Sequence, residues 1–359
     1  MKILVANIGS TSFKYRLFET ETGDVLAEGR AERCLDYDSA IRRCLAEVPA
    51  FDAVGFKAVH AGPLSGARLV DEEVLEAMER FSFHAPAHNP PYIAAMRAFQ
   101  RVAPGVPLVA AFETAFFDAM PEAVTTYAVP WRWREELGIR RYGFHGASHR
   151  AASERIHRLL GRPDLYHVSC HLGGSSSVAA IRGGVAVDTS FGISPQSGLP
   201  QNNRCGDIDA FAVLHVMKKL GLGVEEMAGI LASQSGLAGI SGTSGDVRDL
   251  SDAAAAGNAR ARLAMDVFVR SVRHYIGAFL VELGRLDVLT FSGGIGENSA
   301  EVREAICAGL SGLGIELEPE RNRDLKGEGQ ISRGPVQVWV IPADEERIVA
   351  AESVKVVQQ

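Results

Sequence analysis

Five short segments of the chain carry residue types that suit the transfer of a phosphoryl group. They are NIGSTSFK from Asn7, YGFHGASH around His145, HLGGSSS from His171, NNRCGDID around Arg204, and PADEER, which contains Glu345. Together they supply hydroxyl and backbone donors, a lone arginine, histidines beside glycines and an acidic pair. Phosphoryl transfer depends on charge neutralisation and alignment more than on covalent help from the protein. One shared site therefore explains the five segments better than five separate structural reasons do.

Two of these segments lie in stretches that share one plan: a short apolar strand, a Gly/Ser-rich turn and a second strand. The first stretch runs from Lys2 to Glu19 and the second from Leu165 to Val187. Glycines and serines at such a bend let the backbone approach a ligand closely and expose N–H and hydroxyl donors, which suits phosphate oxygens. Two copies about one domain length apart predict a duplicated, two-lobed fold.

A third glycine turn, GGIGEN, follows a strand predicted over Val288 to Ser292 and precedes a helix predicted through Ala305 and Leu313. A strand, a glycine turn and a helix N-terminus make a site the size of a nucleotide. The turn lacks the third glycine of the dinucleotide fingerprint, and the P-loop signature is absent from the chain. The pattern therefore indicates a nucleotide site of neither the Rossmann nor the P-loop class.

Helices and loops are predicted between these turns. Ser148 is the predicted N-cap of a helix that reaches Leu160 and ends at Gly161. Two loops rich in proline or glycine are predicted at residues 85–92 and 194–207, and the polar second loop is a candidate active-site loop. A longer helix is predicted from Asn258 to Leu283 and stopped by Gly284, with Leu263, Val267, Val272, Ile276 and Leu280 on or near one face.

Composition narrows the classes of function. A chain of 359 residues with 47% hydrophobic and 23% charged residues is an ordinary globular protein of two or three domains. Its formal net charge of -7 repels polyanions, so we expect no nucleic-acid partner.

Five cysteines without a C-x-x-C pair argue against a disulfide framework, and HGASH lacks the glutamate of the zinc motif H-E-x-x-H. Because the chain has no signal-peptide pattern and no apolar run of membrane-spanning length, we expect a cytoplasmic protein with no membrane partner.

From Met1 to about Ala350 the chain resembles the acetate kinase family, short-chain carboxylate kinases of the superfamily that includes sugar kinases, Hsp70 and actin. The motifs NIGSTSFK, HNP, YGFHGASH, CHLGG, RCGDID, SGTSGDVRD, GGIGEN and IPADEE follow one another in the family's order. The resemblance implies an α/β protein with a duplicated actin-like (ribonuclease H-like) ATPase fold and a nucleotide cleft between two lobes. We expect one lobe over residues 1–112, completed by a C-terminal helix at 347–359, and the other over 113–346.

The resemblance also implies a reaction and a set of residues. The reaction moves a phosphoryl group from ATP to a short-chain carboxylate, most simply acetate, and gives an acyl phosphate and ADP reversibly, with Mg²⁺ as cofactor and a homodimer as the assembly. The residues carried over are Asn7 and Glu345 for the metal; Glu113, His145 and Arg204 for catalysis; Lys57 and His88 for the substrate; and Ser10, Ser12, Lys14, His171, Leu172, Gly173, Gly174, Ser175, Asp246, Val247, Arg248, Gly294, Ile295, Gly296, Glu297 and Asn298 for the nucleotide.

The chain departs from the family where it would handle the acyl group. FKAVHAG supplies Lys57 where the family has an arginine that pairs with the substrate carboxylate, and FETAF supplies Glu113 where the family has a catalytic aspartate. The phosphate loop reads HLGGSSS instead of HLGNG, QNNRCGD replaces M-G-T-R-S-G-D, and the chain is shorter between about Glu28 and Phe51. Lys57 and Glu113 keep the sign of the charges they replace. This suggests that the part of the site that handles the acyl group has been adapted more than that its activity has been lost.

Two kinds of alternative remain beside acetate phosphorylation. The acid could be larger, as in a propionate or butyrate kinase, or the chain could be a nucleotide-binding homologue with weakened chemistry that serves as a sensor or partner. The presence of Asn7, His145, Arg204 and Glu345 argues against the second, because a mere binder has little use for groups that stabilise a transition state. A kinase of the same superfamily acting on a hydroxyl group would need a positioned base, and no residue suggests one, whereas a carboxylate is already ionised near pH 7.

Overall fold

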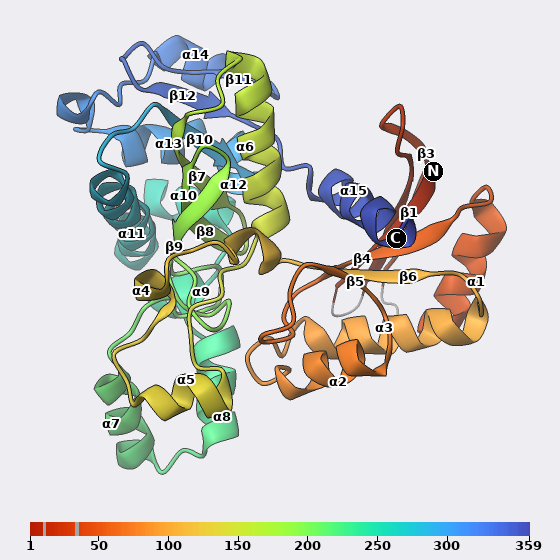
Figure 1. Cartoon of the computed structure of the whole chain (residues 1–359). Coiled ribbons are helices and arrows are strands. Elements are labelled where there is room, and N and C mark those ends of the chain that lie inside the picture. The colour runs from red at the N-terminus through yellow and green to blue at the C-terminus, as the bar shows by residue number, and fades with distance from the viewer. Residues whose placement is uncertain (10–11, 33–35) are drawn as a thin grey trace. The chain divides into compact units, whose positions relative to one another are not determined.

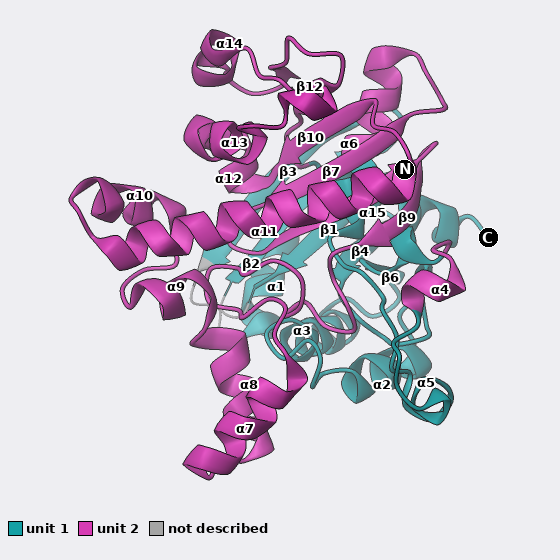
Figure 2. Ribbon diagram, turned by 90° about the vertical axis from the view of Figure 1, so that its left-hand side faces the viewer, with its two compact units in different colours: residues 1–118, 126–151, 344–359 teal, residues 119–125, 152–343 magenta. Residues whose placement is uncertain are grey.

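The computed structural model describes residues 1–9, 12–32 and 36–359 and contains two six-stranded sheets (Figure 1). The chain divides into two compact units (Figure 2). Unit 1 comprises residues 1–118, 126–151 and 344–359, and unit 2 comprises 119–125 and 152–343. None of the helices in the described part of the chain is long and apolar enough to cross a membrane.

The sheet of unit 1 combines an antiparallel meander with parallel strands. Its order is β3-β2-β1-β4-β6-β5, in which β1, β2 and β3 form the meander and β4 and β6 run parallel to β1. Ile3 and Val5 point to one face of the sheet while Leu4, Ala6 and Ile8 point to the other, and both faces are covered, so the strand is apolar along its length. The strands are β1 (Lys2–Ile8), β2 (Ser12–Glu19), β3 (Asp24–Glu32), β4 (Ala53–Ala58), β5 (Ala67–Leu69) and β6 (Leu108–Phe112).

The sheet of unit 2 repeats this plan strand for strand. Its order, β9-β8-β7-β10-β12-β11, places a meander of β7, β8 and β9 beside the parallel strands β10 and β12, with an antiparallel edge strand. The two predicted Gly/Ser hairpins are β1–β2 and β7–β8, so the predicted duplication is confirmed. The strands are β7 (Tyr166–Leu172), β8 (Ser176–Arg182), β9 (Val185–Thr189), β10 (Val288–Ser292), β11 (Gly329–Gln330) and β12 (Gln337–Val340).

Helix α11 is the main packing partner of the second sheet. Asn258 caps its first turn through bonds from the Arg260 and Ala261 amides, and Gly284 ends it in the left-handed conformation, as predicted. The predicted apolar face was wrong at Leu263, which is exposed, because the buried stripe of α11 runs through positions such as Ala264 and Phe268 instead. The helices that lie wholly in unit 2 are α4 (Glu122–Thr125), α7 (Ala210–Leu220), α8 (Val224–Ser233), α9 (Gly236–Ser241), α10 (Val247–Ala255), α11 (Ala259–Leu283), α12 (Gly293–Asn298), α13 (Ala300–Cys307) and α14 (Pro319–Asp324), with a 3₁₀ turn at Ser311–Leu313.

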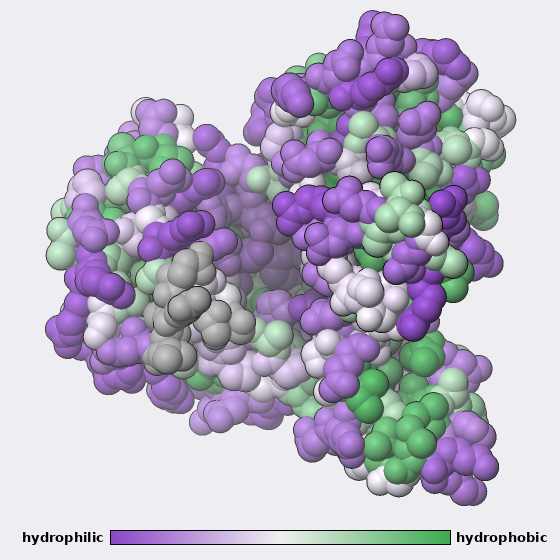
Figure 3. Space-filling view, turned by 180° about the vertical axis from the view of Figure 1, so that it is seen from behind, coloured by the Kyte–Doolittle hydropathy of each residue, from purple (hydrophilic) through white to green (hydrophobic). Residues whose placement is uncertain are grey.

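The pair α7 and α8 leaves apolar side chains exposed. No residue of α7 is buried, and Phe211 is 79% exposed. Figure 3 shows the resulting apolar patch at its lower right, over these two helices. We call this surface the α7–α8 patch; its exposed apolar residues are Ile208, Phe211, Leu214, Val216, Leu220 and Val224.

In unit 1, helices cover both faces of the sheet. Residues of α1, α2 and α3 pack in the larger core with Leu4 and Phe56, while Val349 and Ala350 of α15 pack with Ile3 and Val5 on the opposite face. The helices are α1 (Tyr37–Glu47), α2 (Glu72–Arg80), α3 (Asn89–Val102), α5 (Trp131–Leu137) and α15 (Glu345–Val357), with a 3₁₀ turn at Ala115–Phe117; α6 (Gly146–Leu160) begins in unit 1 and continues in unit 2.

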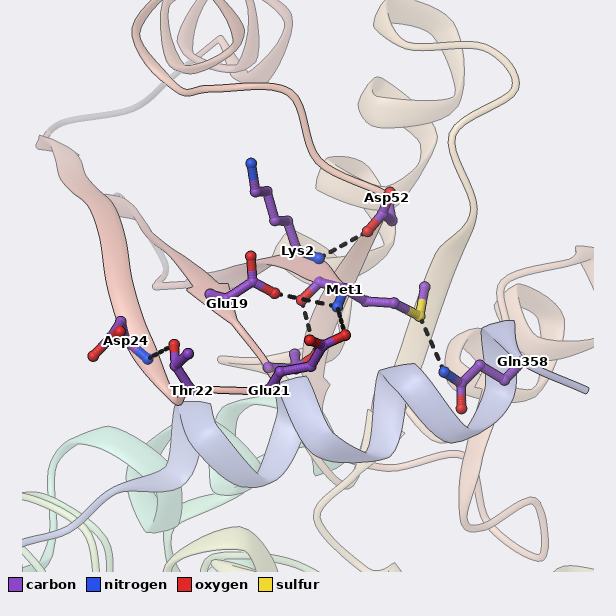
Figure 4. A network of polar contacts seen from close by, with 9 residues as sticks. Met1, Lys2, Glu19, Glu21, Thr22, Asp24, Asp52 and Gln358 are labelled. Atoms are coloured by element: carbon purple, nitrogen blue, oxygen red, sulfur yellow. Dashed lines mark hydrogen bonds and ion pairs between the residues drawn. The ribbon is translucent and has the colours of Figure 1, made fainter.

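Helix α15 brings the C-terminal end of the chain to its beginning (Figure 4). Gln358 Nε2 lies 3.5 Å from Met1 Sδ, and the amino terminus pairs with Glu19 at 3.2 Å and Glu21 at 3.5 Å. Gly55 in the middle of β4 faces α15 so closely that a methyl group there would collide with Ser353 Oγ and lie 3.0 Å from Val349 Cγ1. The fit between β4 and α15 fixes the start of α15, where Glu345 lies.

Two sequence expectations about local structure were wrong. Residues 85–92 were predicted as a loop, but α3 begins at Asn89 with Pro90 and Pro91 in its first turn, where the missing proline N–H groups cost no helical hydrogen bond. GGIGEN was predicted as a turn and is the short helix α12, and the helix predicted to follow it through Leu313 ends at Cys307. Helix α6 starts at Gly146, two residues before the predicted cap, and ends before Gly161 as predicted. The polar segment 194–207 has neither helix nor strand, as predicted.

Gly55→Ala should lower the free energy of unfolding by about 1–3 kcal/mol, because overpacking a closed interface costs that much and the buried Ser353 hydroxyl is already committed to the Val349 carbonyl. Gly277→Ala is the matched control, since a Cβ at this position of α11 meets no atom within 4 Å and should be neutral or stabilising. Denaturant midpoints compare the two variants with the parent. Equal midpoints for Gly55→Ala and the parent would contradict the described fit of α15 on β4.

Candidate active site

An ion pair lies where β4 meets the start of α15. Lys57 Nζ is 2.6 Å from Glu345 Oε2, and the two side chains are only 18% and 16% exposed. Burial alone lowers the pKa of Lys57, but the carboxylates of Glu345 and Glu113 and the phenol of Tyr92 together raise it above its ordinary value. Lys57 is therefore a fixed positive charge, already neutralised by one carboxylate.

Glu113 is a second carboxyl group beside this pair. It follows β6 directly, is 4% exposed, and neither of its oxygens accepts a hydrogen bond from the residues that the structure describes. The pKa of Glu113 is raised to about 7, chiefly by burial. The charge of Lys57 opposes this rise, Glu345 adds to it, and the amides of Ala147 and Gly146 in the first turn of α6 oppose it. Lys57, Glu113 and Glu345 form what we call the acyl cluster.

The predicted metal residue Asn7 lies at the end of β1, next to Tyr92. The Tyr92 hydroxyl donates to Asn7 Oδ1 at 3.4 Å and accepts from the Ile8 amide at 3.2 Å. Burial raises the pKa of Tyr92 to about 12, so the phenol keeps its proton at neutral pH. Lys14 lies opposite Asn7 in the strand register and is exposed.

The remaining predicted residues of unit 1 have different local settings. Ser12 starts β2, and Ser10 lies outside the described residues. His88 occupies the N-cap position of α3. His145, directly before α6, has φ 59°, and no other non-glycine residue that the structure describes has a positive φ. An ordinary residue held in this sparsely populated region is typical of a functional site.

In unit 2 the structure brings Arg204 to the second glycine hairpin. Arg204 Nη1 donates to Ser175 Oγ at 3.2 Å, to Gln201 Oε1 at 3.3 Å and to the Pro195 carbonyl at 3.4 Å. Ser175 Oγ also donates to Gln201 Oε1 at 2.6 Å. Burial lowers the pKa of Arg204, and its hydrogen-bond partners among the described residues are all neutral. The guanidinium is held in position without a counter-charge, which suits an incoming anion.

The predicted nucleotide segments 171–175 and 294–298 lie side by side. His171 pairs with Ser292 in the sheet, and a side chain at Gly293 would come within 2.7 Å of the Leu172 carbonyl. In α12, Glu297 Oε1 accepts from the amides of Gly293 at 2.9 Å and Ala343 at 3.0 Å. Glu297 thus links α12 to Ala343, which lies two residues before Glu345. The other predicted residues of these segments are Gly173, Gly174, Gly294, Ile295, Gly296 and Asn298, whose Nδ2 donates to the Gly294 carbonyl at 2.9 Å.

The third predicted segment, 246–248, reaches the same hairpin through Asn202. The Asn202 amide donates to the Gly174 carbonyl at 3.2 Å, and Gly245 approaches Asn202 too closely to carry a side chain. Asp246 caps α10, and the hydrogen bond from Arg248 lowers its pKa to about 2. Arg248 is 88% exposed, while Val247 is buried.

Sequence reasoning missed three residues that the structure ties to these sites: Tyr92, Gln201 and Asn202. All three lie in segments that the sequence patterns had indicated, HNPPY and QNNRCGD. The sequence does not indicate these three residues because each is tied to its site by a hydrogen bond between distant parts of the chain and by no spacing along it.

No group of three or more histidine, cysteine, aspartate or glutamate side chains among residues 1–9, 12–32 and 36–359 is arranged to hold a metal ion. A hard divalent cation that keeps most of its waters needs fewer protein ligands. The acyl cluster offers two carboxylates to one ammonium, and the Glu113 oxygens accept no hydrogen bond from the described residues. Glu345 and Asn7 are oxygen donors of the kind that Mg²⁺ prefers, so the residues present fit the metal.

The duplicated sheets, the acyl cluster of unit 1 and the arginine held among glycine turns in unit 2 are features expected of a phosphotransferase with the actin-like fold. Residues 39–351 match the model of the acetokinase family. The chain belongs to the acetate kinase family. It is 41% identical to an acetate kinase of Dictyoglomus turgidum, covering 99% of this chain and 98% of that protein, and 38% identical to one of Bacillus subtilis, covering 99% of each.

Solved structures agree with this assignment. The crystal structure of Porphyromonas gingivalis acetate kinase matches with a TM-score of 0.90 at 34% identity over 99% of both chains. A propionate kinase from Francisella tularensis matches with a TM-score of 0.92 at 32% identity over 99% of both chains. The predicted fold is thereby confirmed as the duplicated actin-like fold.

Glu113→Gln should change how stability depends on pH. An unfolded glutamate titrates near ~4.3, so between about pH 4.3 and 7 the folded protein binds a proton that the unfolded chain does not. The parent should therefore lose stability as pH rises through this window and level off above it. Glu113→Gln removes this loss, so its free energy of unfolding relative to the parent should rise by on the order of 1–3 kcal/mol from pH 5 to pH 8. A difference that stays constant across this range would show that Glu113 titrates normally.

Proposed function

We propose that this chain transfers the γ-phosphoryl group of ATP to a short-chain carboxylate, with acetate as the first candidate, and gives an acyl phosphate and ADP reversibly. A carboxylate oxygen bonds to the γ-phosphorus while the bond to the β–γ bridging oxygen breaks. The acyl cluster carries this proposal, because its two carboxyl groups suit a divalent cation, and its partly buried lysine, once that cation engages Glu345, would pair with an acidic substrate.

Lys57 and His88 receive the substrate in this proposal. The substrate is ionised at neutral pH, so no base is required to activate it. Lys57 attracts it as a point charge without the planar fork of arginine, so the acid is oriented less strictly by this cation than it would be by a bidentate arginine. Glu113, beside the Gly146 and Ala147 amides, would act on the carboxylate of the substrate that receives the phosphoryl group.

Glu345 and Asn7 would hold Mg²⁺, the cofactor of this proposal, in part through its water shell. When bound, the metal would supply positive charge that offsets the negative charge of the phosphate groups during transfer. Glu346 is a weaker candidate for this role, because it pairs with Arg16 at 3.2 Å on β2.

Unit 2 would supply most of the nucleotide contacts. We propose that His171 to Ser175, Asp246 to Arg248 and Gly294 to Asn298 bind ATP and ADP, with Ser10, Ser12 and Lys14 of the first hairpin near the phosphates. Arg204 and His145 would stabilise the phosphoryl group in transfer. Arg204 suits this task because its bonds to Ser175 and Gln201 preorganise it before the ligand arrives.

Propionate is the second candidate substrate. The Francisella tularensis propionate kinase is as similar in structure as the acetate kinases are, and Lys57 with Glu113 changes the charged groups of the acyl half. A homologue with weakened chemistry is disfavoured by the preorganised Arg204, since a binder alone gains little from it.

The assembly and compartment are proposals as well. We propose a homodimer, supported by the exposed α7–α8 patch, whose apolar side chains would gain from burial against a second copy. We propose the cytoplasm, where ATP is available, and no nucleic-acid partner, in keeping with the net charge of -7. The lobes 1–112 with 347–359 and 113–346 remain our prediction for the two copies of the duplication.

The function is tested by hydroxamate formation with ATP, Mg²⁺ and unbranched acids from formate to valerate. Arg204→Ala, purified in the same way, controls for a contaminating kinase from the expression host. We expect an acyl phosphate from acetate or propionate, and a loss of turnover by roughly three orders of magnitude in the variant with ADP affinity within a few-fold of the parent. No acyl phosphate from any acid, alongside ADP binding measured by calorimetry, would instead support the non-catalytic homologue.

The pairing of Lys57 with Glu113 is tested by a double-mutant cycle on kcat/KM. Because both groups act on one buried charge network, Lys57→Arg and Glu113→Asp should each lower kcat/KM for the best acid. Together they should restore activity towards acetate beyond the sum of the singles, with a coupling of roughly 0.5–3 kcal/mol. If each single variant instead raises kcat/KM for acetate and the two effects add, Lys57 and Glu113 are neutral changes in a weakened acetate kinase.

A further inference from the structure

Tyr92 links the end of β1 to the acyl cluster and is used by none of the roles above. Its side chain is 1% exposed, in the first turn of α3. Its hydroxyl lies 3.2 Å from the Ile8 nitrogen and 3.4 Å from Asn7 Oδ1. Lys57, Glu113 and Glu345 all act on it electrostatically.

The hydrogen bonds fix the orientation of the Asn7 amide. The phenol oxygen accepts the Ile8 N–H, so its single proton is donated to an acceptor, which is Asn7 Oδ1. No other hydrogen bond reaches the Asn7 side chain from the residues that the structure describes. The amide oxygen keeps one lone pair for a further partner, and Tyr92 holds the group in place.

Tyr92 is itself held rigidly. Three residues earlier, Asn89 Nδ2 donates to the carbonyls of His60 and Met78, both at 2.7 Å, and Asn89 is fully buried. These bonds fix the start of α3 to the chain that follows β4 and to the end of α2. The position of the phenol is therefore set by the fold and not by the ligand.

We propose that Tyr92 is a positioning residue that presents Asn7 to the divalent cation. The inference rests on the role proposed above for Asn7. A phenylalanine would fill the same buried volume, so packing alone gives no reason for the hydroxyl. Its two hydrogen bonds do: it accepts from the buried Ile8 amide, and it donates to Asn7 Oδ1, which orients Asn7. Groups that orient a metal ligand from outside contribute roughly 10- to 100-fold to metal affinity or activity.

Tyr92→Phe removes only the hydroxyl and is the central variant. Tyr142→Phe is its matched control, because Tyr142 is also buried in unit 1 and donates one hydrogen bond, to the Gly138 carbonyl at 2.9 Å. Binding of Mn²⁺ in the presence of ADP, followed by the loss of the free-ion paramagnetic resonance signal, measures metal affinity without turnover. The Mg²⁺ concentration for half-maximal acyl phosphate formation is the second readout.

We expect Tyr92→Phe to weaken Mn²⁺ binding about tenfold or more, Tyr142→Phe to leave it unchanged, and both to lower thermal stability to a similar extent. Asn7→Ala should weaken binding at least as much, and adding Tyr92→Phe to it should have no further effect. Equal Mn²⁺ affinity in Tyr92→Phe and the parent, or additive effects of the two substitutions, would overturn the inference. Failure of the proposed function can be distinguished from failure of this inference. If the parent makes no acyl phosphate, the proposed function is wrong, and the Mn²⁺ affinities of the variants still decide the role of Tyr92.

Discussion

The ion pair between Lys57 and Glu345 is the interaction on which the rest of unit 1 depends. It joins β4, in the middle of the first sheet, to the first residue of the last helix, 288 positions further along the chain. The Lys57 ammonium is largely withdrawn from solvent, and a charge in that position is destabilising when it has no partner. The close fit of α15 over Gly55 and the bonds between the two chain ends hold that partner in place. The charge on Lys57 therefore constrains where the last helix begins.

The duplicated plan gives the two units the same strands but different arrangements of charge. In unit 1 Lys57, Glu345 and Glu113 gather at one point, the first two partly buried and the third fully buried without a hydrogen bond to its carboxyl oxygens from the described residues. In unit 2 the arginine is held by neutral groups among glycines, and the turn at Ser175 is fixed by Gln201. Lys57 and Glu113, the two departures in the acyl half, belong to one electrostatic network, so a change at either alters the other.

Much of the fold could be predicted because it is encoded locally. The hairpins at β1–β2 and β7–β8, the cap at Asn258 and the stop at Gly284 depend on residues within a few positions of each other. The errors at the element boundaries have local causes as well. The prolines at 90 and 91 predict a loop but are favourable in the first turn of α3, and the glycines of GGIGEN predict a turn but lie in the short helix α12. The hydrogen bonds of Tyr92 and Gln201 span up to 85 and 26 positions, and no periodicity reports such contacts. The family resemblance predicted that Lys57 and Glu113 share the substrate site and that Glu345 holds the metal, whereas the ion pair between Lys57 and Glu345 is seen only in the structure.

The most direct test of this account is a thermodynamic cycle on Lys57 and Glu345, using Lys57→Met, Glu345→Gln and the double variant, with unfolding measured in denaturant. Lys57→Met leaves the partly buried Glu345 without its cation, and Glu345→Gln leaves Lys57 with only Glu113 beside it, so each should lower the free energy of unfolding by roughly 1–3 kcal/mol. The double variant should lose far less than the sum, with a coupling of at least ~1 kcal/mol, because it buries neither charge. Small and additive losses would show that the pair is solvated and independent, and would contradict the central place given to it here.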